Sequence, residues 1–350
     1  MNIGELFGSA EMEMPKDRTT NDFVVFLETW FANYQFRVDL LDNTPGLCRR
    51  IRQNRGQIKD LSAAILTAVR HYLDGNPSLA YRDLESGIGF VAANLNTLAS
   101  RSISFAQIGP LYRVARVKSS NVPPGRLFHA PFEYRHKVGH HRYGIPGFPC
   151  LYLGDSLELC LSELRVARNR VHAVAVSQFG VRRGISLNVL DFGLRPAALA
   201  PIAWGRQIED AKANPKANPD LEAFLANYAI CWPLVAASSV KTMYDGDPFV
   251  AEYIVPQLIL QWLMQNTEVD GVRYFSSRFN PDPTSVKGSI NYVFPAVQCS
   301  TPSQSYSPKL KSMFELSSPI VWGHWKQKRF RAETGAKEAE LAAHPRFPLP

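Results

Sequence analysis

The hydrophobic pattern of this chain changes near residue 108, and this change limits the folds that the chain can adopt. Before it, apolar residues recur at helical spacing, as in the series Ile58, Leu61, Ile65 and Val69. After it, short apolar runs are separated by turn signals, and helical segments lie between some of them. Strands and helices in no strict alternation predict an α+β fold with a mixed or antiparallel central sheet, preceded by an all-helical N-terminal region.

The helical region is predicted to contain an antiparallel hairpin between residues 45 and 100. Gly75 is placed to end the first helix, and Asn76 followed by Pro77 supplies an N-cap and a first-turn proline for the second. Two interpretations remain open for this region. It is either a helical cap packed on the next domain or a separate RNA-cleaving or partner-binding domain.

The segments predicted after residue 108 define the rest of the chain. The predicted strands are 111–117, 150–153, 171–176, 185–190, 272–275 and 292–294, and the predicted helices are 156–170, 219–231 and 249–266. We therefore predict a helical region over 1–105, an α+β body over 106–320 and a basic C-terminal tail over 321–350. The end of the chain, from residue 327, is expected to lie on the surface.

Composition and charge restrict the function classes. The chain has 350 residues, of which 45% are hydrophobic and 20% charged, as is typical of globular proteins rather than disordered or coiled-coil ones. Its net charge of +8 is concentrated, since residues 111–170 hold ten basic and four acidic residues and residues 301–350 hold eight and four. Such a surface suits a nucleic acid, a phosphorylated small molecule or an acidic partner, and charge alone does not choose among them.

The sequence predicts a cytoplasmic protein with no membrane partner. Its five cysteines form no CxxC pair or metal-ligand spacing and are expected to be reduced core residues. The acidic first 17 residues lack the features of a signal peptide. The longest apolar stretch, 228–240, is too short to span a bilayer and is interrupted by Pro233.

Residues 150–170 contain the strongest candidate for chemistry. A strand that ends at Leu153 is followed by Asp155 and Ser156, either of which can cap the next helix. Helix geometry places Glu163 in the apolar stripe of that helix, with no basic residue three or four positions away. Because buried carboxylates are uncommon and often functional, we interpret Glu163 either as a catalytic or ligand-binding group or as half of an ion pair with a distant arginine.

Two further residues lie near the ends of predicted strands. Tyr152 precedes Glu163 by 11 positions and could flank the same pocket, although an aromatic residue in such a strand is more often part of the core. Arg113 alternates with Tyr112 and Val114, so it must face solvent, a carboxylate or a phosphate.

Other sites are weaker. The segment RHKVGHH (135–141) has an arginine-to-histidine spacing found in some ribonucleases, but it reads as a loop and contains no complete ligand set, so no metal is expected. Walker, GxGxxG and nucleophile-elbow patterns do not occur.

Three ordered blocks of the sequence resemble the RES domain toxins, a family named for arginine, glutamate and serine. LYRVAR (111–116) resembles the opening strand with its arginine at Arg113, and HRYGIPGFPCLYLGDSLELCLSEL (141–164) resembles the central block that ends on Glu163. DGVRYFSS (270–277) places the serine at Ser276, and the stretch from Asn291 to Phe294 resembles the closing strand. The resemblance covers roughly 108–320. It departs at His141-Arg142-Tyr143-Gly144, where many members carry Gly-Gly-Arg-x-Asn, so Arg142 matches the family less closely than Arg113.

The resemblance implies a fold similar to the ADP-ribosyltransferase toxins and an enzyme that consumes NAD. NAD is then the substrate, bound by Arg113, Arg142, Tyr152, Ser276 and Asn291. Glu163 would stabilise the ribosyl cation formed when the nicotinamide bond breaks, with Arg113 and Ser276 assisting. Residues 106–320 would form the catalytic domain of a toxin-like NAD glycohydrolase or NAD phosphorylase, which releases nicotinamide.

Several alternatives stay open at this point. With the same chemistry, the enzyme would transfer ADP-ribose to a protein target. In a different class, the chain would be a basic RNA-binding or RNA-cleaving module, although the resemblance makes nucleic acid a less favoured partner. Inorganic phosphate, an antitoxin or immunity protein, and a second copy of the chain are the further partners that we consider.

Overall fold

The computed structural model divides the chain into two compact units, which we describe separately. The helical unit comprises residues 1–101, 190–267 and 282–286, and the sheet unit comprises residues 102–189, 268–281 and 287–350. The structure describes residues 1–42, 46–99, 102–104, 108–164, 173–211, 219–244, 246–265, 268–279, 282, 288–298, 304–322 and 330–349.

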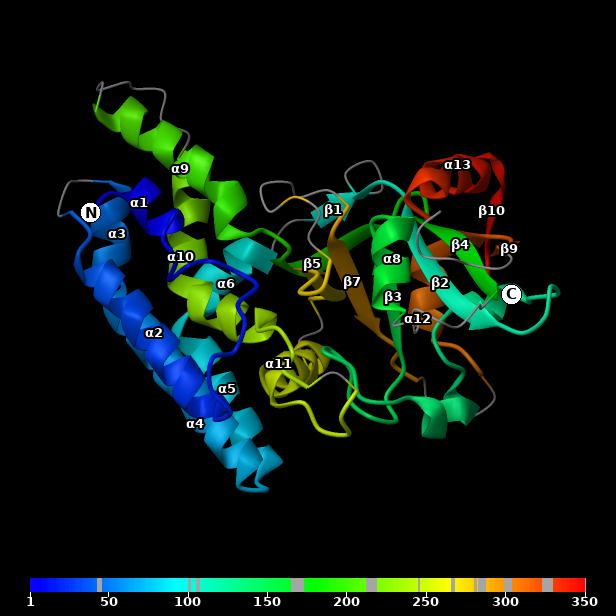
Figure 1. The fold of residues 1–350 in the computed structure, drawn as a ribbon, viewed down its shortest axis with the longest axis horizontal. Helices are drawn as coiled ribbons and strands as arrows, with labels where there is room; N and C mark the ends of the chain where they lie inside the picture. Colours follow the sequence, from blue (N-terminus) through cyan, green and yellow to red (C-terminus); the bar gives the residue numbers. More distant parts are fainter. Residues whose placement is uncertain are drawn as a thin grey trace. The chain divides into compact units, whose positions relative to one another are not determined.

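The helical unit contains the predicted hairpin and a second set of helices from the middle of the chain (Figure 1). Its α-helices are α1 (Ile3–Phe7), α2 (Phe23–Asp39), α3 (Leu47–Gln53), α4 (Arg55–Leu73), α5 (Pro77–Phe90), α6 (Ala92–Ala99), α9 (Pro196–Ala211), α10 (Pro219–Ser239) and α11 (Ile254–Gln265), and η3 (Ala251–Tyr253) is a 3₁₀ turn. Helices α4 and α5 pack closely and are joined at Gly75, whose φ of 81° lies in the left-handed region that favours glycine. The apolar stripe of α4 is buried, as its periodicity predicts.

Helix α10 forms the core of the helical unit. The indole of Trp232 packs against the rings of Tyr34 and Trp30, with centroid distances of 4.0 and 5.2 Å. The Tyr34 hydroxyl donates to the Ala229 carbonyl at 2.6 Å. By length and composition alone, the segment Asp220–Ser239 could cross a membrane. It begins before the apolar run 228–240, which by itself is too short to span a bilayer. However, 83% of the most apolar 18-residue stretch of this segment is buried inside the protein, as in the core helix of a globular unit.

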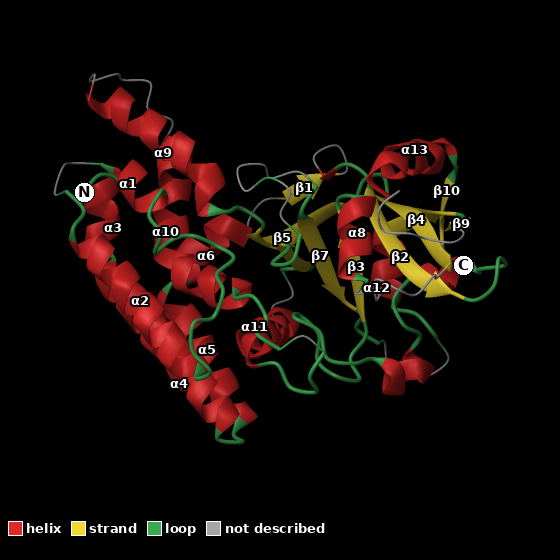
Figure 2. Ribbon diagram, viewed as in Figure 1, coloured by secondary structure: helices red, strands yellow, loops and turns green. Residues whose placement is uncertain are grey.

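The sheet unit is built on a ten-stranded sheet with the order β1-β5-β6-β7-β3-β2-β4-β8-β10, in which β9 also pairs with β4 (Figure 2). The strands are β1 (Ser102–Ser104), β2 (Leu111–Val117), β3 (Cys150–Gly154), β4 (Ala173–Val181), β5 (Ser186–Phe192), β6 (Gly271–Phe275), β7 (Ile290–Pro295), β8 (Phe314–Ser317), β9 (Ile320–Trp322) and β10 (Arg346–Pro348). The helical elements are η1 (Pro124–Leu127), η2 (Phe132–Lys137), α8 (Leu157–Glu163), α12 (Pro308–Met313) and α13 (Phe330–Ala343). Helices followed by a curled sheet confirm the predicted α+β class.

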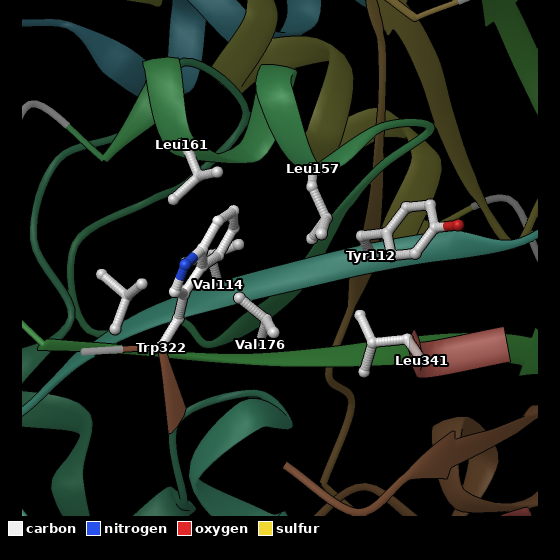
Figure 3. Close-up of a cluster of buried hydrophobic side chains, with 8 residues drawn as sticks. Tyr112, Val114, Leu157, Leu161, Val176, Trp322 and Leu341 are labelled. Carbon is white, nitrogen blue, oxygen red and sulfur yellow. The ribbon is translucent and has the colours of Figure 1, made fainter. Parts of the chain in front are cut away.

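Helix α8 is anchored on the sheet by a hydrophobic cluster (Figure 3). Leu157 and Leu161 extend from α8 toward β2 and β4, where Val114 and Val176 are buried. Trp322 of β9 completes the cluster on one side, and the rest of its members are Tyr112, Val174 and Leu341. The position of α8, and of the Glu163 at its C-terminal end, is therefore set by core packing.

The structure differs from the predicted division of the chain in two places. Residues 190–267, predicted within the catalytic body, belong to the helical unit, because the nearly all-apolar α10 packs against α3, α4 and α6. Residues 330–349, predicted as surface tail, form α13 and β10 of the sheet unit. There Leu341 is fully buried and β10 pairs with β8. The predicted helical segment 165–170, and residues 171–172 and 327–329 of the other predicted elements, lie outside the described residues.

Candidate functional site

The candidate site is built where α8 follows β3. Ser156 is the N-cap of α8, and its hydroxyl oxygen accepts the Leu159 amide at 3.2 Å. The Leu157 amide donates to the Glu338 carboxylate of α13 at 2.8 Å, so a distant helix satisfies a second amide of the first turn. Helix α8 has seven residues, from Leu157 to Glu163. A strong N-terminal cap and the buried leucines thus fix the direction in which Glu163 is presented.

The Glu163 carboxylate is held by side chains from two other strand ends. Its Oε1 accepts the Ser276 hydroxyl at 2.6 Å and the Asn291 amide nitrogen Nδ2 at 3.2 Å. Its Oε2 lies 3.8 Å from Nε of Arg278. The side chain remains 32% exposed, so the carboxylate is fixed in place while part of it faces solvent. The sequence left open whether Glu163 belongs to a polar ligand site or pairs with an arginine distant in sequence. The structure shows polar side chains around the carboxylate and an arginine, Arg278, near its Oε2.

Ser276, which directly follows β6, is fully buried. Its hydroxyl donates to Glu163, and its oxygen accepts the backbone amides of Arg278 and Phe279 at 3.1 and 3.0 Å. The hydroxyl hydrogen and two acceptor positions of Ser276 are thus already used within the protein. This geometry favours a role in positioning Glu163 and shaping the turn after β6 over the direct contact with NAD that the resemblance implies for Ser276.

Arg113 lies where two strands of the sheet diverge. Strand β2 pairs with β4 along seven residues, but its ladder with β3 consists of the single pair Tyr112 and Gly154. Next to this pair, the Arg113 guanidinium Nη1 donates to the Tyr152 carbonyl at 3.2 Å. Burial lowers the pKa of Arg113 to about 10, so the guanidinium remains positively charged at neutral pH. The sheet therefore holds a half-buried cation between its separating strands.

Tyr152 and Arg142 lie near these residues in different ways. The Tyr152 ring centroid is 5.6 Å from that of His141, and its hydroxyl approaches Gly144 so closely that a Cβ at position 144 would lie 2.5 Å from it. Arg142 is largely buried and donates from Nη2 to the Ser277 hydroxyl at 2.9 Å. The loop that departs from the family pattern therefore packs Gly144 against Tyr152 and joins Arg142 to the residue after Ser276.

The structure thus brings the candidate residues together in two groups. Glu163, Ser276 and Asn291 are joined by hydrogen bonds, and Arg113 is joined to the backbone of Tyr152. Cys160, one turn before Glu163 in α8, links this helix to β2, since its thiol donates to the carbonyl of Tyr112, the residue before Arg113, at 3.2 Å. Burial raises the pKa of this thiol, which keeps it neutral at physiological pH.

Sequence reasoning missed two residues of this site. Arg278 was not singled out, although it follows Ser276 by two positions and belongs to the same turn. Asp155 was considered only as a helix cap, whereas its carboxylate accepts the Gly288 and Ile290 amides at 2.8 and 3.0 Å. A buried-strand pattern followed by an acidic residue was the available signal for Asp155.

No metal centre is evident in the part of the chain that the structure describes. Among those residues, no group of three or more His, Cys, Asp or Glu side chains is arranged to hold an ion. In the loop weighed as a ribonuclease site, Arg135 donates to the Gln298 side chain at 2.7 Å. His71 of α4 lies 2.5 Å from Asp83 of α5, a contact that links the two helices of the hairpin.

Comparison with known proteins places the chain in a family. The model of the RES domain matches residues 110–306, which is more than half of the chain. A protein of Bacillus subtilis (strain 168) named "Putative toxin YopC" is 26% identical over 350 residues, covering 96% of this chain and 73% of that protein. No solved structure gives a significant match. The matched range begins at the strand of Arg113 and contains Glu163, Ser276 and Asn291, and the chain therefore belongs to the RES domain family.

Proposed function

We propose that this chain is a toxin-like enzyme that cleaves the bond between nicotinamide and ribose in NAD, by hydrolysis or phosphorolysis. Membership of the RES domain family supports a toxin-like, NAD-related function in general terms. The observation that carries the specific proposal is the fixed carboxylate of Glu163, whose Oε1 accepts hydrogen bonds from Ser276 and Asn291.

A carboxylate held in this way suits the cleavage of an N-glycosidic bond. As nicotinamide leaves, positive charge develops on the ribose, and a preorganised negative group beside it lowers the barrier. The two hydrogen bonds to Oε1 fix the orientation of the carboxylate before the substrate binds. Glu163 would then stabilise the ribosyl cation, while its partly exposed oxygen accepts a ribose hydroxyl.

Arg113 and Tyr152 supply the groups that the rest of NAD requires. The pyrophosphate of NAD carries negative charge, which a half-buried guanidinium binds well because it can donate in a bidentate manner. The Tyr152 ring offers an aromatic face for nicotinamide. Arg142, tied to Ser277, would add a second cation near the same substrate.

The products of one reaction decide the proposal. Purified full-length protein is incubated with NAD, with and without inorganic phosphate, and the products are identified by chromatography and mass spectrometry. We expect free nicotinamide, together with ADP-ribose in water or a phosphorylated ADP-ribose when phosphate is the acceptor. Covalent ADP-ribose on added protein would assign the transferase reaction instead.

Two variants purified in the same way provide the controls: loss of turnover in Glu163→Gln excludes a contaminating activity, and a second variant shows whether removing a carboxylate elsewhere lowers turnover. Glu315→Gln removes a half-exposed carboxylate of β8 that pairs with Arg346 at 3.4 Å, and it should retain wild-type turnover. Salt-dependent RNA binding without any NAD turnover would refute the proposal and favour the nucleic-acid alternative. If the enzyme acts on the NAD of the cytoplasm, expression should arrest growth, and a cognate antitoxin should relieve the arrest.

A further inference from the structure

A short turn that leads into β7 and includes its first residue, Ile290, connects the parts of the candidate site. This turn, Gly288–Ile290, directly precedes Asn291, the residue that donates to Glu163. The Ser276 amide also donates to the Ser289 carbonyl at 2.8 Å. Asn291 is thus joined to the turn by a peptide bond, and Ser276 is joined to it by a hydrogen bond. Both residues that bind Oε1 of Glu163 are therefore attached to the same turn.

Asp155 also binds this turn, through both oxygens of its carboxylate. Its Oδ2 accepts the Gly288 amide at 2.8 Å and its Oδ1 accepts the Ile290 amide at 3.0 Å. The Asp155 amide in turn donates to the Ile290 carbonyl at 3.0 Å. The next residue, Ser156, donates its hydroxyl to the Gly288 carbonyl at 3.1 Å while it caps α8. Four hydrogen bonds thus join the start of α8 to this turn.

The conformation of the turn requires this support. Gly288 has φ of 82°, in the left-handed region that favours glycine, so the backbone is not extended at this residue. Each of the two Asp155 oxygens accepts one amide of the turn, whereas an asparagine at this position would present one acceptor oxygen and, in place of the other, an NH2 donor facing a backbone amide. Asp155 is half-buried; burial raises the pKa of its carboxyl group, and the hydrogen bonds from Ile290 and Gly288 oppose this effect.

We propose that Asp155 is a positioning residue for the Glu163 site: it fixes the turn Gly288–Ile290 relative to α8 and so aligns Asn291 and Ser276 with the Glu163 carboxylate. The expected effect on NAD cleavage rests on the proposed function, whereas the expected effect on the alignment of the turn with Glu163 does not. Asp155 does not touch Glu163 through any described bond, and it acts through the backbone of the turn. Its loss should therefore lower the rate of the chemical step more than the affinity for NAD.

The test compares Asp155→Asn with Asp270→Asn in the full-length protein. Asp270 is a matched control because it also accepts a backbone amide, that of Asn188 at 3.0 Å, and lies at the opposite end of β6 from Ser276. For Asp155→Asn we expect kcat for NAD cleavage to fall on the order of 10- to 100-fold, as for a displacement of about 1 Å, with KM within about twofold of wild type. Asp270→Asn should keep the wild-type kcat.

A double variant separates positioning from general destabilisation. In the Ser276→Ala background Glu163 has already lost one of its supports, so Asp155→Asn should cost distinctly less than it does alone. A wild-type kcat in folded Asp155→Asn, or losses that multiply independently in the double variant, would overturn the proposal. If Asp155→Asn does not fold, Ser156→Gly replaces it, because glycine is tolerated at an N-cap but removes the bond to Gly288.

Amide hydrogen exchange tests the same inference without NAD. In Asp155→Asn, the peptides that contain residues 276–279 and 288–291 should exchange about tenfold faster than in wild type and in Asp270→Asn. Unchanged exchange in both peptides would refute the role of Asp155. Absence of NAD cleavage by the wild-type protein would refute the proposed function alone, and the exchange measurement would still decide whether Asp155 fixes the site.

Discussion

Replacing Glu163 with glutamine is the most direct perturbation of the candidate site. The amide has the volume of the carboxylate, and its oxygen can still accept from Ser276 and Asn291, so the fold should survive. The change removes one negative charge from the place where ribose would become positive. A unit charge about 4 Å from a developing cation contributes about 4 kcal/mol at an effective dielectric constant of about 20.

The partial exposure of Glu163 reduces this energy. Because 32% of the side chain is exposed, water screens the interaction, and we take about 3 kcal/mol as the expected loss. This corresponds to a fall in kcat on the order of 10²-fold. Nicotinamide release is measured at saturating NAD for wild type, Glu163→Gln and the control Glu315→Gln, and the melting temperature of each protein is recorded. A folded Glu163→Gln with kcat within about threefold of wild type would show that this carboxylate does not stabilise the transition state.

Other changes test further parts of the structure. Arg113→Lys should raise KM for NAD on the order of tenfold in a steady-state assay, because an ammonium group cannot bind a phosphate in the bidentate manner of a guanidinium; an unchanged KM would argue against phosphate binding there. Ser276→Ala should lower the free energy of unfolding by about 2 to 4 kcal/mol in urea titrations, since two buried amides and Glu163 lose a partner, and an unchanged midpoint would contradict this. Burial lowers the pKa of His129 from 6.5 to about 4, so the neutral form is favoured in the folded state, and stability should fall by about 3 kcal/mol from pH 6.5 to pH 4. His129→Gln should lack this component in chemical denaturation at the two pH values. Deleting residues 1–101 should produce aggregates in size-exclusion chromatography, because it exposes the faces of α10 around Trp232; a monomeric, active deletion protein would contradict this reasoning.

The deletion prediction also shows what the sequence could indicate about the helical unit. The hairpin of α4 and α5 was predictable because its apolar spacing is local and Gly75 marks the turn. Helix α10 is apolar on nearly all sides, so its sequence contains no stripe that points to a partner. Its place among helices that lie more than a hundred residues earlier depends on long-range packing, which periodicity does not report.

The same distinction applies to the sheet unit. Strand β2 was predicted with its observed bounds, 111–117, because alternation and turn signals are local features. The C-terminal segment was predicted as a tail because it is charged and contains prolines, but the fully buried side chain of Leu341 and a short pairing with β8 place it in the fold. Composition describes the average of a segment, whereas packing can depend on one residue.

The candidate site depends both on local sequence motifs and on long-range packing. Arg113, Glu163, Ser276 and Asn291 were selected from sequence blocks, and the structure brings the last three into direct contact although 113 and 128 residues separate Glu163 from its two partners. The strand order accounts for this, since β6, β7 and β3 are neighbours and α8 follows β3. For Asp155 the sequence showed only an acidic residue after a buried strand, and its role was not evident because it depends on backbone amides that any residue can supply. A site whose side chains come from separate strand ends needs such backbone links, and their loss should affect the reaction rate before it affects the fold.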